Sequence, residues 1–124
     1  MLTDTQILTE QVEDVTVVRI SDAAELTAGP EDFPGQALYE LIDEAGCGKI
    51  VLELSAVRVL FSMALSVLLR LREKAERIGG RIVLCGVRGS LQKLLAFTRI
   101  DEIFEQFAVA DEALLSLGVG DEQS

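Results

Sequence analysis

Ser62 is the strongest candidate for a functional side chain in this 124-residue sequence, as a site of phosphorylation. It follows an apolar run at residues 50–54 and starts a long helical pattern that ends at Gly79-Gly80. A helix N-terminus has free N–H groups and a partial positive charge, so it would accommodate a phosphate on Ser62. That phosphate adds about −1.5 to −2 charge and would oppose the docking of a partner. The alternative is that Ser62 only caps the helix, which is worth about 1 kcal/mol.

The residues that follow Ser62 along the expected helix predict a docking face. They fall outside the core stripe of the helix at spacings i, i+3, i+4 and i+7, and they are Met63, Ser66, Val67 and Arg70. A partly apolar strip on an exposed helix suits partner docking. The alternative for Val67 is that it lies half-buried against a neighbouring helix.

No other residues have the types and spacing of a catalytic, cofactor or metal site. The chain has no His, which removes Ser-His and Cys-His pairs and most zinc sites. The segment Gly86-Val87-Arg88-Gly89 lacks the Lys and Ser/Thr of a P-loop and is interpreted as a connection. The pairs Asp101-Glu102 and Asp111-Glu112 are interpreted as solvated acids at helix starts. We therefore expect no enzymatic activity, no cofactor and no metal.

Composition and charge narrow the class of protein further. A chain of this length with 49% hydrophobic and 26% charged residues fits one globular domain over residues 1–124, with a polar tail from residue 118. No apolar run approaches the roughly 20 residues that span a bilayer, and no secretory signal is visible, so we expect a cytoplasmic protein without membrane contact. The two cysteines are expected to be reduced, with Cys85 in the core. The net charge of −10 argues against direct binding of nucleic acid, which needs Lys and Arg to neutralise phosphates.

The elements that must position Ser62 alternate between strands and helices, which indicates an α/β fold with a mainly parallel sheet. The segments are a hairpin over residues 6–20, an irregular connection at 21–34, a helix at 34–44, a strand at 49–54, a helix at 62–79, a strand at 81–85, a helix from Ser90 to 96 or 97, a short strand at 103–107 and a helix at 110–117.

The helix at residues 62–79 is predicted in more detail, because it carries the candidate site. Its core stripe is expected to comprise Leu65, Leu68, Leu71 (or Arg72), Ala75 and Ile78. Glu73 and Arg77 are expected to form an i, i+4 ion pair on the solvent-exposed side of this helix.

The order of these segments resembles the STAS domain, the fold of bacterial anti-sigma factor antagonists. The resemblance covers residues 15–117 and rests on a strand that ends Leu54-Ser55, on Gly79-Gly80 before the next strand and on a late segment at 94–104. The family block Asp-Ser-Ser-Gly-Leu-Gly aligns with Phe61-Ser62-Met63-Ala64-Leu65-Ser66, where the first serine and the leucine match. The resemblance implies a mixed sheet of four to five strands with about four helices.

The resemblance also implies a partner switch. In the family, the unphosphorylated domain binds an anti-sigma factor, usually a serine kinase of the GHKL type, and phosphorylation of the first serine releases it. A PP2C-type phosphatase is a second expected partner. By this resemblance Ser62 is the phosphoacceptor, and the contact face comprises Met63, Ser66, Val67 and Arg70.

Departures from the family block keep two other functions open. Phe61 stands where the family has an acidic residue, and Met63 and Ala64 also differ from the block. These changes favour a STAS scaffold that has lost the switch and serves in a stressosome-like or transport-associated assembly. A small nucleotide-binding protein on the same fold is the third alternative, although the missing His and phosphate loop argue against it. Each of these three functions is compatible with a homodimer.

Overall fold

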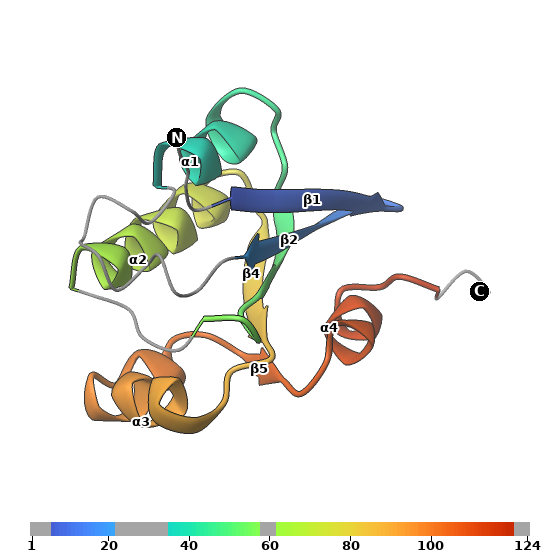
Figure 1. Cartoon of the computed structure of the whole chain (residues 1–124). Helices are drawn as coiled ribbons and strands as arrows, with labels where there is room; N and C mark the ends of the chain where they lie inside the picture. The colour runs from blue at the N-terminus through green and yellow to red at the C-terminus, as the bar shows by residue number, and fades with distance from the viewer. Residues whose placement is uncertain (1–5, 22–34, 58–61, 121–124) are drawn as a thin grey trace.

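The structure is a computed structural model, and it describes residues 6–21, 35–57 and 62–120. Over these residues the centre of the fold is a five-stranded sheet in the order β1-β2-β3-β4-β5 (Figure 1). The mixed sheet and the four α-helices in this described part of the chain confirm the predicted α/β fold class. The elements are β1 (Gln6–Val12), β2 (Val15–Ser21), α1 (Gly35–Asp43), β3 (Lys49–Glu53), α2 (Ser62–Arg77), β4 (Arg81–Cys85), α3 (Gly89–Phe97), the short 3-10 helix η3 (Ile100–Glu102), β5 (Gln106–Phe107) and α4 (Ala110–Ser116).

The predicted hairpin is confirmed at the start of the sheet. β1 and β2 run antiparallel, with Val12 opposite Val15 around a two-residue turn. From β2 onward the neighbouring strands run parallel. The three central residues of β3 are all buried, which is why this strand is a consecutive apolar run rather than an alternating one.

Helices cover the two faces of the sheet unequally. Figure 1 shows α1, α2 and α3 on one side and α4 on the other. Leu52 of β3 packs with Leu68 of α2 in the larger core, whereas Val51 and Val83 pack with Ala113 of α4 in the smaller one. Side chains of successive strand residues point to opposite faces, so β2, β3 and β4 each contribute to both cores. Full burial of each such leucine contributes about 1.5–3 kcal/mol.

The core stripe of α2 differs from the prediction at one end. Leu68, Leu71 and Ala75 are buried and Leu65 is half-buried, as expected. Ile78 is instead 51% exposed, because α2 ends at the residue before it and Ile78 lies in the turn that leads from α2 to β4.

Two local details on the helices also differ from the prediction. In α2 the structure places an i, i+4 ion pair one residue earlier than expected, between Arg72 Nη2 and Glu76 Oε2 at 3.0 Å. The helix predicted to start at Ser90 starts one residue earlier, at Gly89, and Arg88 occupies the N-cap position of α3. The extended backbone of Arg88 places its carbonyl to accept the first helical bond, from the N–H of Leu91 at 3.2 Å.

The C-terminal strand is shorter than predicted, because the N–H groups of Ile103 and Phe104 donate to the carbonyl of Ile100 in the turn that follows η3 and not to the sheet. The expected connection at 21–34 lies outside the described residues, apart from its first residue, which ends β2. Among the helices that the structure describes, none is long and apolar enough to cross a bilayer.

Candidate functional site

The site begins where the chain enters α2 at Ser62, as the sequence predicts. The segment after β3 is anchored to the sheet, because the N–H of Leu54 donates to the carbonyl of Cys85 at 2.9 Å. The N–H of Val57 then donates back to the carbonyl of Leu54 at 2.9 Å, and both of these residues are buried. The strand, this anchored turn and the packed helix together fix where the N-terminus of α2 lies.

Two of the predicted site residues have side chains outside the described part of the chain. Both Ser62 and Met63 are in α2, and their backbone is helical. The N–H groups of this first turn have no partner within the helix, which is the property that makes a helix start receptive to phosphate. The phosphoacceptor and capping roles of Ser62 and the contact role of Met63 stay predictions.

Two residues of the predicted docking face lie on the outer side of α2, and their contact role stays a prediction. Ser66 and Arg70 are exposed, as expected. Together with Tyr39 of α1, Leu69 and Glu73 they line a shallow hollow on the surface of α1 and α2. Leu69 is 38% exposed, so this hollow offers a partner an apolar contact beside polar groups.

Val67 does not lie on this face, which corrects the prediction. Only 7% of it is exposed, and it belongs to the larger core. The reason is that α2 packs against α1 as well as the sheet, so its buried side is wider than a single stripe. The alternative weighed from sequence, burial against a neighbouring helix, comes closer to the structure.

A second hollow continues along α2 from the first. Arg70 and Glu73 line both, and Lys74 and Arg77 complete the second. We call this continuous depression the α2 groove. Lys74 ties the two helices together, since its Nζ lies 2.8 Å from Asp43 Oδ2 and 5.3 Å from the ring centroid of Tyr39. Sequence analysis missed Leu69, Tyr39 and this basic extension, although Arg77 lies at i+7 from Arg70 on the same face.

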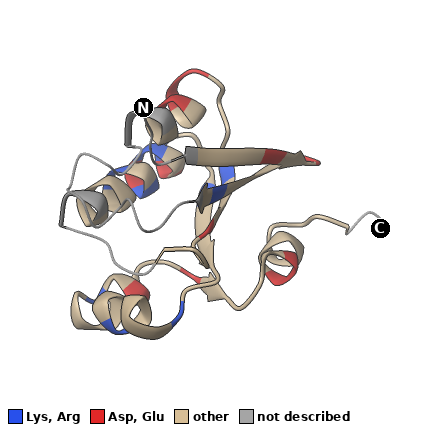
Figure 2. Cartoon of the chain, viewed as in Figure 1, with Lys and Arg blue, Asp and Glu red and all other residues tan. Residues whose placement is uncertain are grey.

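Charge is strongly segregated along the chain, and the basic part includes α2, β4 and α3. Residues 58–99 hold nine basic and two acidic residues, a net charge of +7, whereas the rest of the chain carries two basic and 19 acidic residues. Figure 2 shows both basic and acidic residues along α2, and Asp and Glu at the tip of the β1–β2 hairpin, at the end of α1 and on α4. The α2 groove is lined by three basic side chains and one acidic one, so a partner that approaches it meets a locally positive surface on an acidic molecule.

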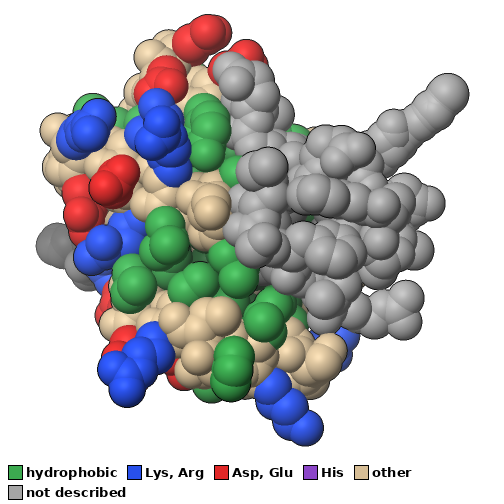
Figure 3. All heavy atoms as spheres, turned by 90° about the vertical axis from the view of Figure 1, so that its left-hand side faces the viewer, with side chains coloured by type: hydrophobic (Ala, Val, Ile, Leu, Met, Phe, Trp, Pro, Cys, Tyr) green, Lys and Arg blue, Asp and Glu red, His purple; other side chains and the backbone are tan. Residues whose placement is uncertain are grey.

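Apolar side chains lie next to these cations. Figure 3 shows the side of the molecule that carries α2 and α3, where hydrophobic side chains gather beside Lys and Arg. Phe97 on α3 is 88% exposed, and Leu69 on α2 is 38% exposed. Exposed aromatic and apolar groups rimmed by charge are typical of protein–protein interfaces.

Near the carboxyl ends of β3 and β4, hydrogen bonds and close packing position the start of the segment that leads to α2. Ser55 Oγ donates to Glu53 Oε1 at 2.9 Å, and Arg88 Nη2 donates to the carbonyl of Ser55 at 3.4 Å. Gly86 packs so closely here that a Cβ would lie 2.8 Å from Glu53 Oε2 and 3.0 Å from the Ser55 nitrogen. The segment 86–89 is thus a connection with a positioning role.

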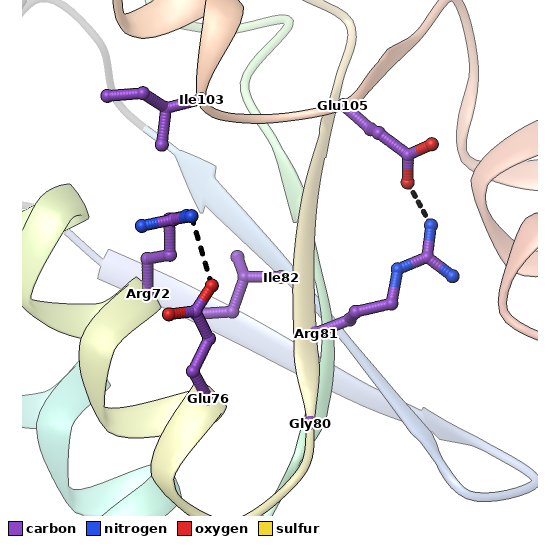
Figure 4. Close-up of a pocket in the computed structure, with 7 residues that line it drawn as sticks. All are labelled: Arg72, Glu76, Gly80, Arg81, Ile82, Ile103 and Glu105. Atoms are coloured by element: carbon purple, nitrogen blue, oxygen red, sulfur yellow. Dashed lines mark hydrogen bonds and ion pairs between the residues drawn. The ribbon is translucent and has the colours of Figure 1, made fainter.

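A further pocket lies beside β4, and its carboxylates are engaged by arginines. In Figure 4 the pair Arg72–Glu76 lies on one side of the strand, and Arg81 pairs with Glu105 on the other. An arginine guanidinium has only donors, so each of these two glutamates accepts hydrogen bonds from its arginine partner. The charged groups of this pocket are thus engaged with one another in two ion pairs.

Both cysteines are free thiols in the structure. Cys85 is fully buried, and burial, followed by the nearby Glu53 carboxylate, raises the pKa of its thiol to about 11. Such a thiol is a weak nucleophile at neutral pH, which agrees with its predicted core role. Among the described residues, no group of three or more His, Cys, Asp or Glu side chains could hold a metal ion.

Comparison with known proteins confirms the predicted fold. A family model for the STAS domain matches residues 6–113, while no curated protein matches the sequence. An anti-sigma factor antagonist from Mycobacterium paratuberculosis is 24% identical with a TM-score of 0.75, over 91% of this chain and 93% of that one. The Bacillus cell fate determinant SpoIIAA in its phosphorylated form is 15% identical with a TM-score of 0.65, over 90% and 99%. A chain of the stressosome is 22% identical with a TM-score of 0.69, over 89% and 95%.

Proposed function

Because the chain belongs to the STAS domain family, we propose that it is a non-enzymatic regulatory domain that binds an anti-sigma factor of the GHKL serine-kinase type. In this proposal phosphorylation of Ser62 releases the partner, and a PP2C-type phosphatase reverses the modification. The observation that carries the proposal is the position of Ser62 as the first residue of α2, followed on the same helix by the exposed residues of the α2 groove.

The α2 groove supplies the contact surface in this proposal. Ser66, Leu69 and Arg70 begin one turn after Ser62 and are exposed. Arg70, Lys74 and Arg77 extend the surface away from Ser62 and favour an acidic partner surface. Met63 is proposed as a further contact, while Val67 supports this surface from the core.

Phosphate on Ser62 would change this contact through charge and hydration. It brings about −1.5 to −2 charge and three strong acceptor oxygens to one end of the groove. An acidic partner surface that matches the groove would be repelled, and docking would require the phosphate to lose bound water. The free N–H groups and partial positive charge at the N-terminus of α2 would stabilise the phosphate. Phosphorylation would therefore not destabilise the folded protein that is released.

The decisive experiment combines mass spectrometry with binding. The protein is purified from its native host, its intact mass is measured and any modified peptide is mapped. We expect an addition of about 80 Da, one phosphate, on Ser62. The GHKL-type kinase encoded nearest to the protein then serves as the binding probe. Ser62→Asp should weaken binding at least tenfold, and Ser62→Ala should bind but accept no phosphate.

Ser66→Asp is the matched control, since Ser66 is an exposed serine one turn further along the same helix. An effect equal to that of Ser62→Asp would mean that any added charge disrupts the face, and the assignment of the switch to Ser62 would fail. Protein that stays unmodified across growth and stress conditions would overturn the switch and leave a constitutive STAS scaffold.

A further inference from the structure

The strand β1 forms one edge of the sheet, and its outer side has no partner strand among the described residues. It is seven residues long, whereas β5 at the opposite edge has two. Residues 8–11 of β1 are all exposed, and Leu8 is 56% exposed. Short edge strands resist pairing with other chains, so β5 is protected in a way that β1 is not.

The backbone of β1 presents hydrogen-bonding groups to this free side. The two-residue turn makes Val12 and Val15 a hydrogen-bonded closing pair, and such pairs alternate with non-bonded ones along the hairpin. Leu8 and Glu10 therefore bond to β2. The N–H and C=O groups of the residues between them, Ile7, Thr9 and Gln11, point away from β2 toward the open edge.

The usual devices that block an edge strand are absent from β1. Its sequence, QILTEQV, contains no Lys and no Pro, and its register with β2 runs without a bulge from Gln6–Ser21 to Val12–Val15. Its one charged side chain, Glu10, pairs with Arg19 at 3.2 Å. An open edge of this length without such protection is a template for a further strand.

We infer that β1 pairs antiparallel with β1 of a second copy of the chain, around a two-fold axis at Thr9. An antiparallel pair bonds only where outward-facing residues oppose one another. At least two of the three outward residues take part only when the axis lies at Leu8, Thr9 or Glu10. An axis at Glu10 would set two carboxylates opposite each other, which is unfavourable. An axis at Thr9 pairs Thr9 with Thr9 and Ile7 with Gln11, so it uses every outward group of Gln6–Val12 and opposes no like charges.

The self-complementarity of this strand is the reason to choose a second copy over another partner. The same seven residues serve both sides, as a two-fold interface requires. The pairing joins two sheets into one and uses none of the residues that line the α2 groove. It is therefore independent of the function proposed above.

The test measures molar mass in solution over a hundredfold range of concentration. We expect the wild-type mass to rise from that of one chain, 13.5 kDa, toward twice that value. Thr9→Lys places two cations against each other at the axis and should hold the mass at one chain. Leu115→Lys is the matched control, because Leu115 is 68% exposed on α4 and gains the same charge. Thr9→Pro, which removes an outward N–H, should act as Thr9→Lys does.

A crosslinking experiment tests the axis itself in a Cys47→Ser background. Residues of a hydrogen-bonded antiparallel pair have Cα atoms about 5.5 Å apart, within the range that a disulfide spans. Thr9→Cys should therefore form a disulfide-linked dimer at least tenfold faster than Gln11→Cys. A wild-type mass of one chain at all concentrations, a dimer that Thr9→Lys leaves intact, or faster crosslinking at Gln11 would each overturn the inference.

Discussion

Gly80 lies directly against the backbone of Gly48, where β4 and β3 begin side by side. A Cβ on Gly80 would lie 2.0 Å from the carbonyl oxygen of Gly48 and 2.6 Å from its carbonyl carbon. The next residue, Arg81, donates its N–H to the same carbonyl at 2.7 Å. Because Gly80 has no side chain, the chain that leaves α2 can reach the sheet at the point where the first hydrogen bond between the β3 and β4 segments forms.

The end of α2 explains why two glycines are needed here in sequence. Gly79 has φ +77, and the N–H of Gly80 donates to the carbonyl of Ala75 at 2.8 Å, which closes the last turn of the helix. Gly79 supplies the left-handed conformation, whereas Gly80 supplies the close approach. The predicted helix stop at Gly79-Gly80 is therefore confirmed, and only the second glycine touches the sheet.

Gly80→Ala should destabilise the protein far more than Gly79→Ala. The new methyl group of Gly80→Ala meets backbone atoms of Gly48, the residue before β3, which cannot move without disturbing the hydrogen bond from Arg81. We therefore expect a loss of about 2–4 kcal/mol. Gly79→Ala enters open space and adds only the left-handed strain, about 1 kcal/mol. Urea unfolding of both variants measures the difference, and equal losses would show that conformation alone sets the requirement.

Val67→Ala separates the core of α2 from its docking face. Val67 is buried, so its truncation leaves a cavity and should cost about 1–3 kcal/mol of unfolding free energy. Ser66→Ala, one residue earlier and exposed, should change stability by less than about 0.5 kcal/mol. Thermal unfolding of the two variants provides the measurement. A Val67→Ala protein as stable as the wild type would contradict the burial of this side chain.

Arg70→Glu tests the charge of the α2 groove. Arg70 lines both hollows, so reversing its charge should weaken binding of the proposed kinase partner about fivefold at low salt, close to 1 kcal/mol. The loss should shrink as salt screens exposed charges. Lys93→Glu on α3 changes the net charge equally and does not line the groove. An equal effect from Lys93→Glu would mean that overall charge, rather than the groove, controls binding.

The sequence was sufficient to predict the order of elements, because each one carries its own local signal. The β-branched run at 15–20 predicts a strand, and the apolar spacing of Leu68, Leu71 and Ala75 predicts the buried side of a helix. The turn at Glu13-Asp14 and the stop at Gly79-Gly80 mark boundaries through the residues themselves. These features depend on near neighbours in the chain, so a single sequence contains them.

The details that the sequence missed depend on residues far apart in the chain. Val67 is buried because α1 packs beside α2. The spacing of apolar residues within α2 carries no information about that contact. The α2 groove needs Tyr39 from α1, and the ion pair of Lys74 needs Asp43. Such juxtapositions arise only when the helices have packed, which is why helical spacing identified Ser66 and Arg70 but not the whole face.

The pH dependence of stability should contain a contribution from Cys85. Burial raises the pKa of its thiol from 9.0 to about 11 in the folded protein, with the Glu53 carboxylate as the second cause. Between about pH 9 and pH 11 the unfolded chain therefore releases this proton while the folded protein keeps it. The unfolded state binds fewer protons in this window, so unfolding free energy falls as the pH rises. Urea unfolding at pH 8 and pH 10.5 measures the fall.

Cys85→Ala is the control for this pH effect, since every other titrating group is unchanged in it. The variant should be less stable at pH 8 but should lose less stability on going to pH 10.5 than the wild type does. Iodoacetamide at pH 8 gives an independent measurement: in the folded protein it should modify the half-buried Cys47 and leave Cys85 intact, while in urea it should modify both. Rapid labelling of Cys85 in the folded protein, or identical pH profiles for the two proteins, would contradict a buried thiol with a raised pKa.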